Sequence, residues 1–98
     1  MLFDPQDVQA GINAGATRIQ PYFPDFSLGA LGPVRQQLET VLQKWPGDLS
    51  GRFVTMFVEL VTVAEIARSQ YQHPQLDEDA LTAFLAHSAA FFNSWKHK

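Results

Sequence analysis

The chain has 98 residues, of which 46% are hydrophobic and 17% are charged, and its formal net charge is −3. This length and apolar content suit one folded domain, residues 1–98, and argue against a disordered chain. The seven lysines and arginines are scattered, which argues against nucleic-acid binding, and the lack of cysteine excludes disulfides and thiolate metal sites.

The first predicted helix covers residues 5–19. Asp4 is placed to cap it, and Pro5 suits the first helical position. Its apolar positions recur every three or four residues, namely Val8, Ile12, Gly15, Ala16 and Ile19. Gly11 and Gly15 lower the helix propensity but carry no side chain, so that another helix can approach closely.

Residues 20–32 contain too much proline and glycine for a long helix, yet they are too apolar for a free linker. Two interpretations are open. The aromatic side chains plug one end of the core, or they form a recognition surface, because tyrosine and phenylalanine anchor many protein interfaces. Tyr22, Phe23 and Phe26 are therefore candidate partner-binding residues.

The second predicted helix, residues 33–45, opens on Pro33 and has one apolar stripe, typical of a helix with a single buried face. The stripe consists of Val34, Leu38, Val41, Leu42 and Trp45. A short turn follows, in which Asp48 is placed to cap the next helix. So short a connection predicts that the second and third helices are antiparallel neighbours.

The third predicted helix, residues 49–70, is apolar almost all the way round, so the other helices have to enclose it. At about 100° per residue, one broad face is expected to form the core. It contains Phe53, Met56, Phe57, Leu60, Val63, Ala64 and Ala67, extended by Val54, Val58 and Val61. A narrow strip with Thr55, Glu59 and Thr62 is expected to face water. The pattern predicts an all-α protein, a four-helix bundle with a central, nearly all-apolar third helix.

The fourth predicted helix, residues 77–96, begins at a capping Asp77, with Leu76 and Leu81 placed as a hydrophobic staple. Its predicted core stripe is Leu81, Phe84, Leu85, Ser88, Phe91, Phe92 and Trp95. A second side carries small residues, among them Ala83 and Ala90. Small residues permit the close approach of another chain, but alanine also simply favours helix. Both interpretations stay open, and these two alanines are candidate partner-binding residues.

Signals for catalysis are weak. His87 is the only histidine within a predicted helix, an arrangement that resembles histidine-phosphotransfer domains. The lysine and glycine that those domains carry near the histidine are missing from residues 86–91, so phosphotransfer is a minor alternative and a histidine at a contact is preferred. No metal-ligand spacing, serine-nucleophile motif or phosphate loop is present. The chain is predicted to be no enzyme and to use no metal or cofactor.

Arg68 falls within the apolar side of the third helix, three residues after Glu65, with which it can pair. It either extends its stem along the core and its charge into water, or it is reserved for a carboxylate of a partner. Arg68 and His87 complete the candidate partner-binding residues.

The amino terminus lacks the positive charges and apolar core of a signal peptide. The charges of Arg52, Glu59 and Glu65 within the most apolar helix make a membrane-spanning segment unfavourable. We therefore expect a cytoplasmic protein without membrane contact.

The preferred function is a non-enzymatic protein-binding module that acts through apolar surface complementarity, with a second copy of itself as a homodimer or with a specific protein partner. An immunity protein or antitoxin, a secretion chaperone and an adaptor all fit this description. The alternative is a carrier of a small apolar ligand in the bundle core. Its candidate lining is Met56, Phe57, Phe84 and Phe91.

Overall fold

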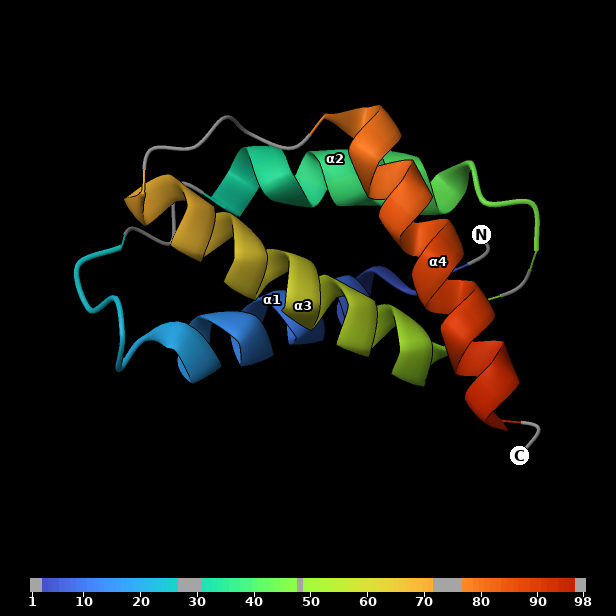
Figure 1. Cartoon of the computed structure of the whole chain (residues 1–98), viewed down its shortest axis with the longest axis horizontal. Coiled ribbons are helices and arrows are strands. Elements are labelled where there is room, and N and C mark those ends of the chain that lie inside the picture. The colour runs from blue at the N-terminus through green and yellow to red at the C-terminus, as the bar shows by residue number, and fades with distance from the viewer. Residues whose placement is uncertain (1–2, 27–30, 48, 72–76, 97–98) are drawn as a thin grey trace.

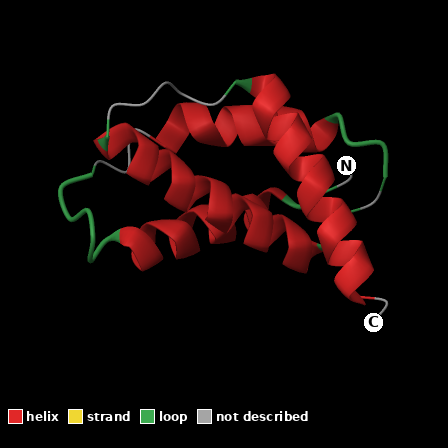
Figure 2. Cartoon of the chain, viewed as in Figure 1, coloured by secondary structure: helices red, strands yellow, loops and turns green. Residues whose placement is uncertain are grey.

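The computed structural model describes residues 3–26, 31–47, 49–71 and 77–96, and in these ranges it consists of helices and loops without a strand (Figure 2). The helices are α1, Pro5–Ile19; α2, Gly32–Gln43; α3, Gly51–Gln70; and α4, Glu78–Lys96 (Figure 1). The predicted all-α bundle is confirmed, and each helix boundary lies within two residues of its prediction.

Short polar side chains begin three of the helices. Asp4 and Asp77 cap α1 and α4 as predicted, and their carboxylates accept backbone hydrogen bonds of 2.9 and 2.7 Å. The start of α3 is capped by Ser50, whose hydroxyl oxygen accepts a backbone hydrogen bond of 3.1 Å, so this helix begins two residues later than predicted. Asp48 and Leu76, predicted as a cap and as half of a staple, lie outside the described residues.

The most extensive contact between helices joins α1 and α3, which run parallel (Figure 1). A Cβ atom placed on Gly11 would lie 2.6 Å from the Cβ of Val58, and one on Gly15 would lie 2.8 Å from the Cβ of Thr62. Real Cβ atoms essentially never come closer than 3.0 Å to a heavy atom of another, non-neighbouring residue. Only glycine permits this approach, as predicted.

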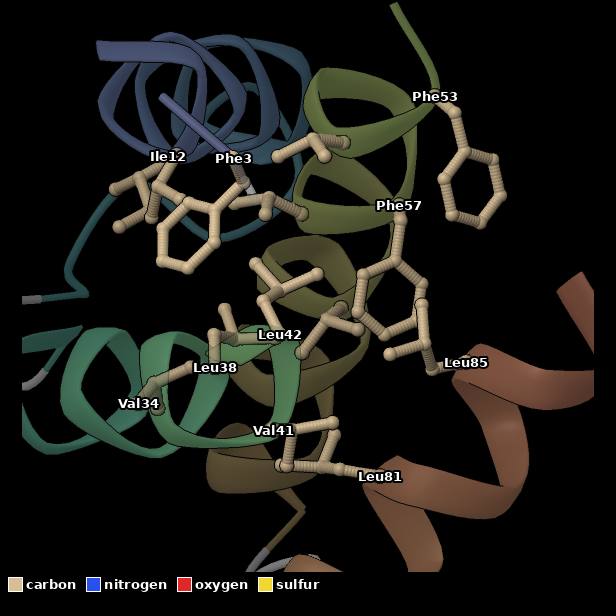
Figure 3. Packing of buried hydrophobic residues seen from close by; sticks show 14 of the residues in the cluster. Phe3, Ile12, Val34, Leu38, Val41, Leu42, Phe53, Phe57, Leu81 and Leu85 are labelled. Carbon is tan, nitrogen blue, oxygen red and sulfur yellow. The ribbon is translucent and has the colours of Figure 1, made fainter. Parts of the chain in front are cut away.

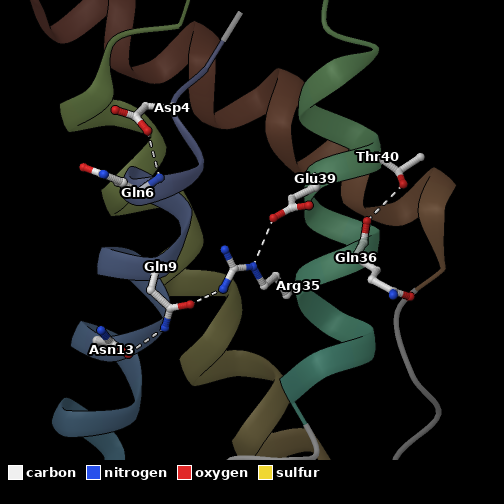
Figure 4. Close-up of polar contacts among 8 residues, drawn as sticks. All are labelled: Asp4, Gln6, Gln9, Asn13, Arg35, Gln36, Glu39 and Thr40. Atoms are coloured by element: carbon white, nitrogen blue, oxygen red, sulfur yellow. Dashed lines mark hydrogen bonds and ion pairs between the residues drawn. The ribbon is translucent and has the colours of Figure 1, made fainter. Parts of the chain in front are cut away.

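The second helix, α2, runs antiparallel to α3, as predicted (Figure 1). Its buried residues are Val34, Leu38, Val41 and Leu42. On its polar side, Arg35 donates a hydrogen bond of 3.0 Å to Glu39 within α2 and another to the amide oxygen of Gln9 on α1 (Figure 4). Arg35 therefore bridges the two helices on the side that the core does not reach.

Buried hydrophobic residues from all four helices form one cluster (Figure 3). Its largest fully buried side chains are Phe57, Leu38, Leu42, Leu81 and Leu85. The predicted stripe of α1 is buried throughout, and that of α2 is buried except for the half-buried Trp45.

The fourth helix, α4, crosses α2 and the beginning of α3 instead of running along them (Figure 1). Its contacts with α3 are aromatic: ring centroids of Phe84 and Phe57 lie 5.3 Å apart, as do those of Phe92 and Phe53. Phe91 is 68% exposed, so its assignment to the core stripe is wrong. The reason is the crossing, which leaves this side of α4 without a neighbouring helix.

In the described part of the chain, no helix combines the length and the hydropathy that crossing a bilayer requires.

Candidate protein-binding surface

The core side of α3 is rotated relative to the prediction. Its buried residues are Phe53, Val54, Phe57, Val58, Val61, Thr62, Glu65 and Ile66. Met56, Leu60 and Ala64 were predicted to lie in the core but face outward. Met56 and Leu60 are 37% and 48% exposed, and Ala64 is exposed as well. The physical reason is the contact with α1, because Gly11 and Gly15 allow that helix to pack closely on the side of α3 that carries Val58 and Thr62.

An apolar strip therefore remains partly uncovered along α3, although two of its residues, Val63 and Ala67, also pack against the core cluster. We call it the outer strip and define it by Met56, Leu60, Val63, Ala64 and Ala67. Ala64 is exposed, and Val63 and Ala67 are half-buried. Steps of four, three and four residues lead along it from the first residue to the last, the spacing of a seam on which another helix packs. The outer strip contains no charged residue.

At the C-terminal end of α3, the outer strip reaches a hollow with a volume of about 620 Å³. This aromatic hollow is lined by Arg18, Ile19, Tyr22, Phe23, Val63 and Tyr71. The rings of Phe23 and Tyr71 meet edge to face with their centroids 6.1 Å apart. Tyr22 and Tyr71 are 77% and 68% exposed. Walls this open suit a side chain presented by another protein better than an enclosed small ligand.

An ion pair forms one edge of this surface. Arg18 of α1, which lines the aromatic hollow, donates a hydrogen bond of 2.5 Å to Glu59 of α3. An exposed pair of this kind contributes little to folding stability. Among the described residues that line the hollow, Arg18 is the only cation, and Glu59 compensates its charge.

Two polar residues lie on the core side of α3. Thr62, predicted to face water, is completely buried, and its hydroxyl oxygen has no hydrogen-bond partner among the described residues. The prediction is wrong because Thr62 packs against α1 at Gly15. Glu65 is 4% exposed and accepts hydrogen bonds of 2.8 and 3.0 Å from Arg68 through one carboxylate oxygen, which confirms the predicted pair.

The charge of Arg68 is therefore engaged within the chain, and its contact with a carboxylate of a partner stays a prediction. The second carboxylate oxygen of Glu65 is buried and has no partner among the described residues. A buried oxygen without a hydrogen bond is unfavourable for folding, and this cost offsets part of what the two hydrogen bonds from Arg68 contribute.

The aromatic residues after α1 divide between the two interpretations left open by the sequence. Tyr22 is exposed, as a recognition residue requires. Phe23 and Phe26 are half-buried and pack against the core cluster, so these two act at least in part as a plug. Residues 27–30, the rest of this segment, lie outside the described residues.

The candidate residues on α4 are all exposed. Ala83, His87 and Ala90 lie where no other helix covers them, and the imidazole of His87 forms no ion pair within the described part of the chain. Their contact with a partner stays a prediction, and so does phosphotransfer by His87.

The residues named for a ligand carrier do not surround one internal space. Phe57 and Phe84 pack ring against ring in the core. Met56 and Phe91 are both exposed on the surface. The carrier function stays a prediction that this arrangement does not favour.

Within the described residues, no three histidine, aspartate or glutamate side chains gather as a metal site.

Comparison with known proteins identifies no relative: no protein-family model, no curated protein and no solved structure matches this chain. The function is therefore inferred from the geometry of the surface alone.

Proposed function

We propose that this chain is a non-enzymatic protein-binding module whose contact surface is the outer strip of α3 together with the aromatic hollow. The observation that supports the proposal is the exposure of Met56 and Leu60 within a strip that carries no charge. Single exposed apolar residues are common on proteins, but contiguous ones mark interaction sites.

Binding at this surface depends on apolar area and shape. Each Å² of apolar surface removed from water contributes about 25 cal/mol, so the larger side chains contribute most. Tyr22 and Tyr71 add aromatic area and hydroxyl groups at the rim, where interfaces are typically polar. The outer strip is favoured over the alanine side of α4 because methionine and leucine present more apolar area per residue than alanine.

Leu60→Lys tests the proposal. Because Leu60 is about half exposed, we expect the free energy of unfolding to change by less than about 1 kcal/mol. The same substitution places a charge in the middle of the outer strip, and we expect it to lower the affinity for the protein partner at least tenfold. The measurement is affinity capture from the native host with tagged full-length chain, followed by titration of the captured protein.

Ala83→Lys is the matched comparison, since it adds the same charge at an exposed position on α4, the candidate surface that competes with the outer strip. It is expected to leave partner capture unchanged. Equal capture by the wild type and Leu60→Lys would show that the outer strip is not the contact surface.

A further inference from the structure

We infer that the protein bound on the outer strip is a second copy of this chain, with the two α3 helices packed antiparallel about a two-fold axis. This inference rests on the proposed function, since it names the occupant of the same surface. In one register of this antiparallel pair, three features of the outer strip are complementary between the two copies. The fourth helix, α4, does not cover the side of α3 on which the second copy would pack.

The first feature is the gradient of side-chain size along the outer strip. Met56 and Leu60 are large and lie in its N-terminal half, whereas Ala64 and Ala67 are small and lie in its C-terminal half. In an antiparallel pair with its axis between residues 60 and 63, Met56 meets Ala67 of the second copy and Leu60 meets Val63. Large side chains then fill the space above small ones, as dense packing requires, whereas a parallel pair sets like against like.

The second feature is the complementarity between the two ends of α3. Arg52 is exposed at the beginning of α3, and no ion pair joins it to another described residue. The register that sets residue 60 against residue 63 also sets Arg52 against Tyr71, since each pair is symmetric about the same axis. Arg52 lies seven residues before Glu59 and so on the same edge of α3, and a two-fold axis sets equal edges together. Its guanidinium is thereby placed beside the aromatic hollow of the second copy, which Arg18 lines on that edge and where aromatic faces attract a cation. Arg18 does not oppose this contact, because Glu59 compensates its charge.

The third feature is the compensation of the charges beside the seam. A two-fold axis sets the same edge of each helix together, so the two Glu59 residues lie on one edge, about 7.5 Å apart along the helix axis. Each carboxylate is paired with Arg18 of its own chain, which reduces the repulsion between them. The fourth helix does not obstruct the approach: it packs on Phe53 and Phe57, which belong to the covered side of α3.

Light scattering of the purified full chain tests the inference. We expect a mass twice the 11.0 kDa of one chain at high micromolar concentration. Leu60→Lys is expected to return the mass to that of one chain, and Ala83→Lys is expected to keep the dimer. Arg52→Glu, an exposed change that leaves the core intact, is expected to weaken dimerisation about tenfold. Circular dichroism of each variant shows whether it remains helical.

Thiol crosslinking tests the register, because the chain has no cysteine of its own. In the antiparallel pair, two copies of Val63→Cys place their thiols about 4.5 Å apart along the helix axis, and two copies of Met56→Cys place them about 16 Å apart. We expect the first variant to crosslink and the second not to, since a disulfide needs Cα atoms within about 7 Å. Efficient crosslinking of both, as in a parallel pair, overturns the inference.

A wild-type monomer at high concentration also overturns the inference, as does a dimer that Ala83→Lys breaks and Leu60→Lys spares. Neither result contradicts the proposed function. The proposed function is contradicted by a different result, in which Leu60→Lys captures the host partner as well as the wild type does.

Discussion

Thr62 is a residue whose environment is set by the packing of two helices, α1 and α3. Its side chain is completely buried against α1, where it lies beside Gly15, and its hydroxyl oxygen has no partner among the described residues. The shape of threonine suits the site because its Cβ and methyl group fill the space beside Gly15. The hydroxyl group itself is unfavourable there, since it loses its hydrogen bonds to water.

Thr62→Val is therefore expected to raise the free energy of unfolding by about 1 kcal/mol, because valine keeps the shape and removes the unpaired hydroxyl. Urea unfolding measures the change. The control is Thr82→Val on α4, where the hydroxyl is exposed and donates a hydrogen bond of 2.9 Å to the carbonyl of Glu78. Its expected change is within about 0.5 kcal/mol. A loss of stability in Thr62→Val would mean that the hydroxyl has a partner in solution.

At the scale of helices, the contact between the parallel helices α1 and α3 determines which side of α3 is buried and which side stays exposed. Gly11 and Gly15 let the backbones of α1 and α3 approach so closely that no residue with a Cβ atom fits at these two positions without a shift. This approach buries the valine side of α3 and turns the outer strip away from α1. The surface that we propose for binding is thus a consequence of a contact on the opposite side of the same helix.

Gly11→Ala tests this contact. Alanine raises the helix propensity by about 1 kcal/mol, but its Cβ would lie 2.6 Å from Val58 and 2.7 Å from the carbonyl oxygen of Thr55. Overpacking of this kind typically costs about 1–3 kcal/mol, so we expect a net loss of stability of about 1 kcal/mol in urea unfolding. Gly32→Ala is the control, because a Cβ there meets no atom within 4 Å and is expected to be neutral or slightly stabilising. Equal stability of both variants would show that the two helices separate readily.

In the whole molecule, the coverage of the helices is uneven. The core cluster unites α1, α2 and α3 with the first half of α4, where Leu81 and Leu85 are buried. Further along α4, Ala90, Phe91 and Asn93 are exposed. Stability is expected to follow this coverage, because local opening requires little free energy where few apolar contacts are broken.

Native-state hydrogen exchange measures this difference. We expect the amides of residues 58–61 in α3 to exchange most slowly and those of residues 90–93 in α4 to exchange at least about 100-fold faster. Residues 81–85, in the covered part of the same helix, serve as the internal control and are expected to lie between these limits. Uniform protection along α4 would show that its second half has a covering that the structure does not contain.

Much of the secondary structure is predictable from short segments. The start of α1 follows from Asp4 and Pro5, and the start of α4 from Asp77, because capping depends on residues only a few positions apart. The stripes of α1 and α2 follow in the same way from apolar spacing within one helix. The loop aromatics were also recognisable as surface candidates, and Tyr22 lines the aromatic hollow.

The outer strip was not predictable by the same argument. Met56 and Leu60 were assigned to the core because a helix that is apolar on every side has no period that marks its buried side. One signal in the sequence could have identified the buried side. Most β-branched residues of α3 lie on that side, which packs against the two glycines of α1.

By itself, the sequence determined the ends of the helices to within two residues and that they form an all-α bundle, because caps, prolines and apolar periods act over a few residues. Only the tertiary structure decided which side of α3 is covered and that α4 crosses the bundle. Those outcomes depend on contacts such as Gly15 with Thr62, between residues far apart in the chain, whose fit no local pattern records.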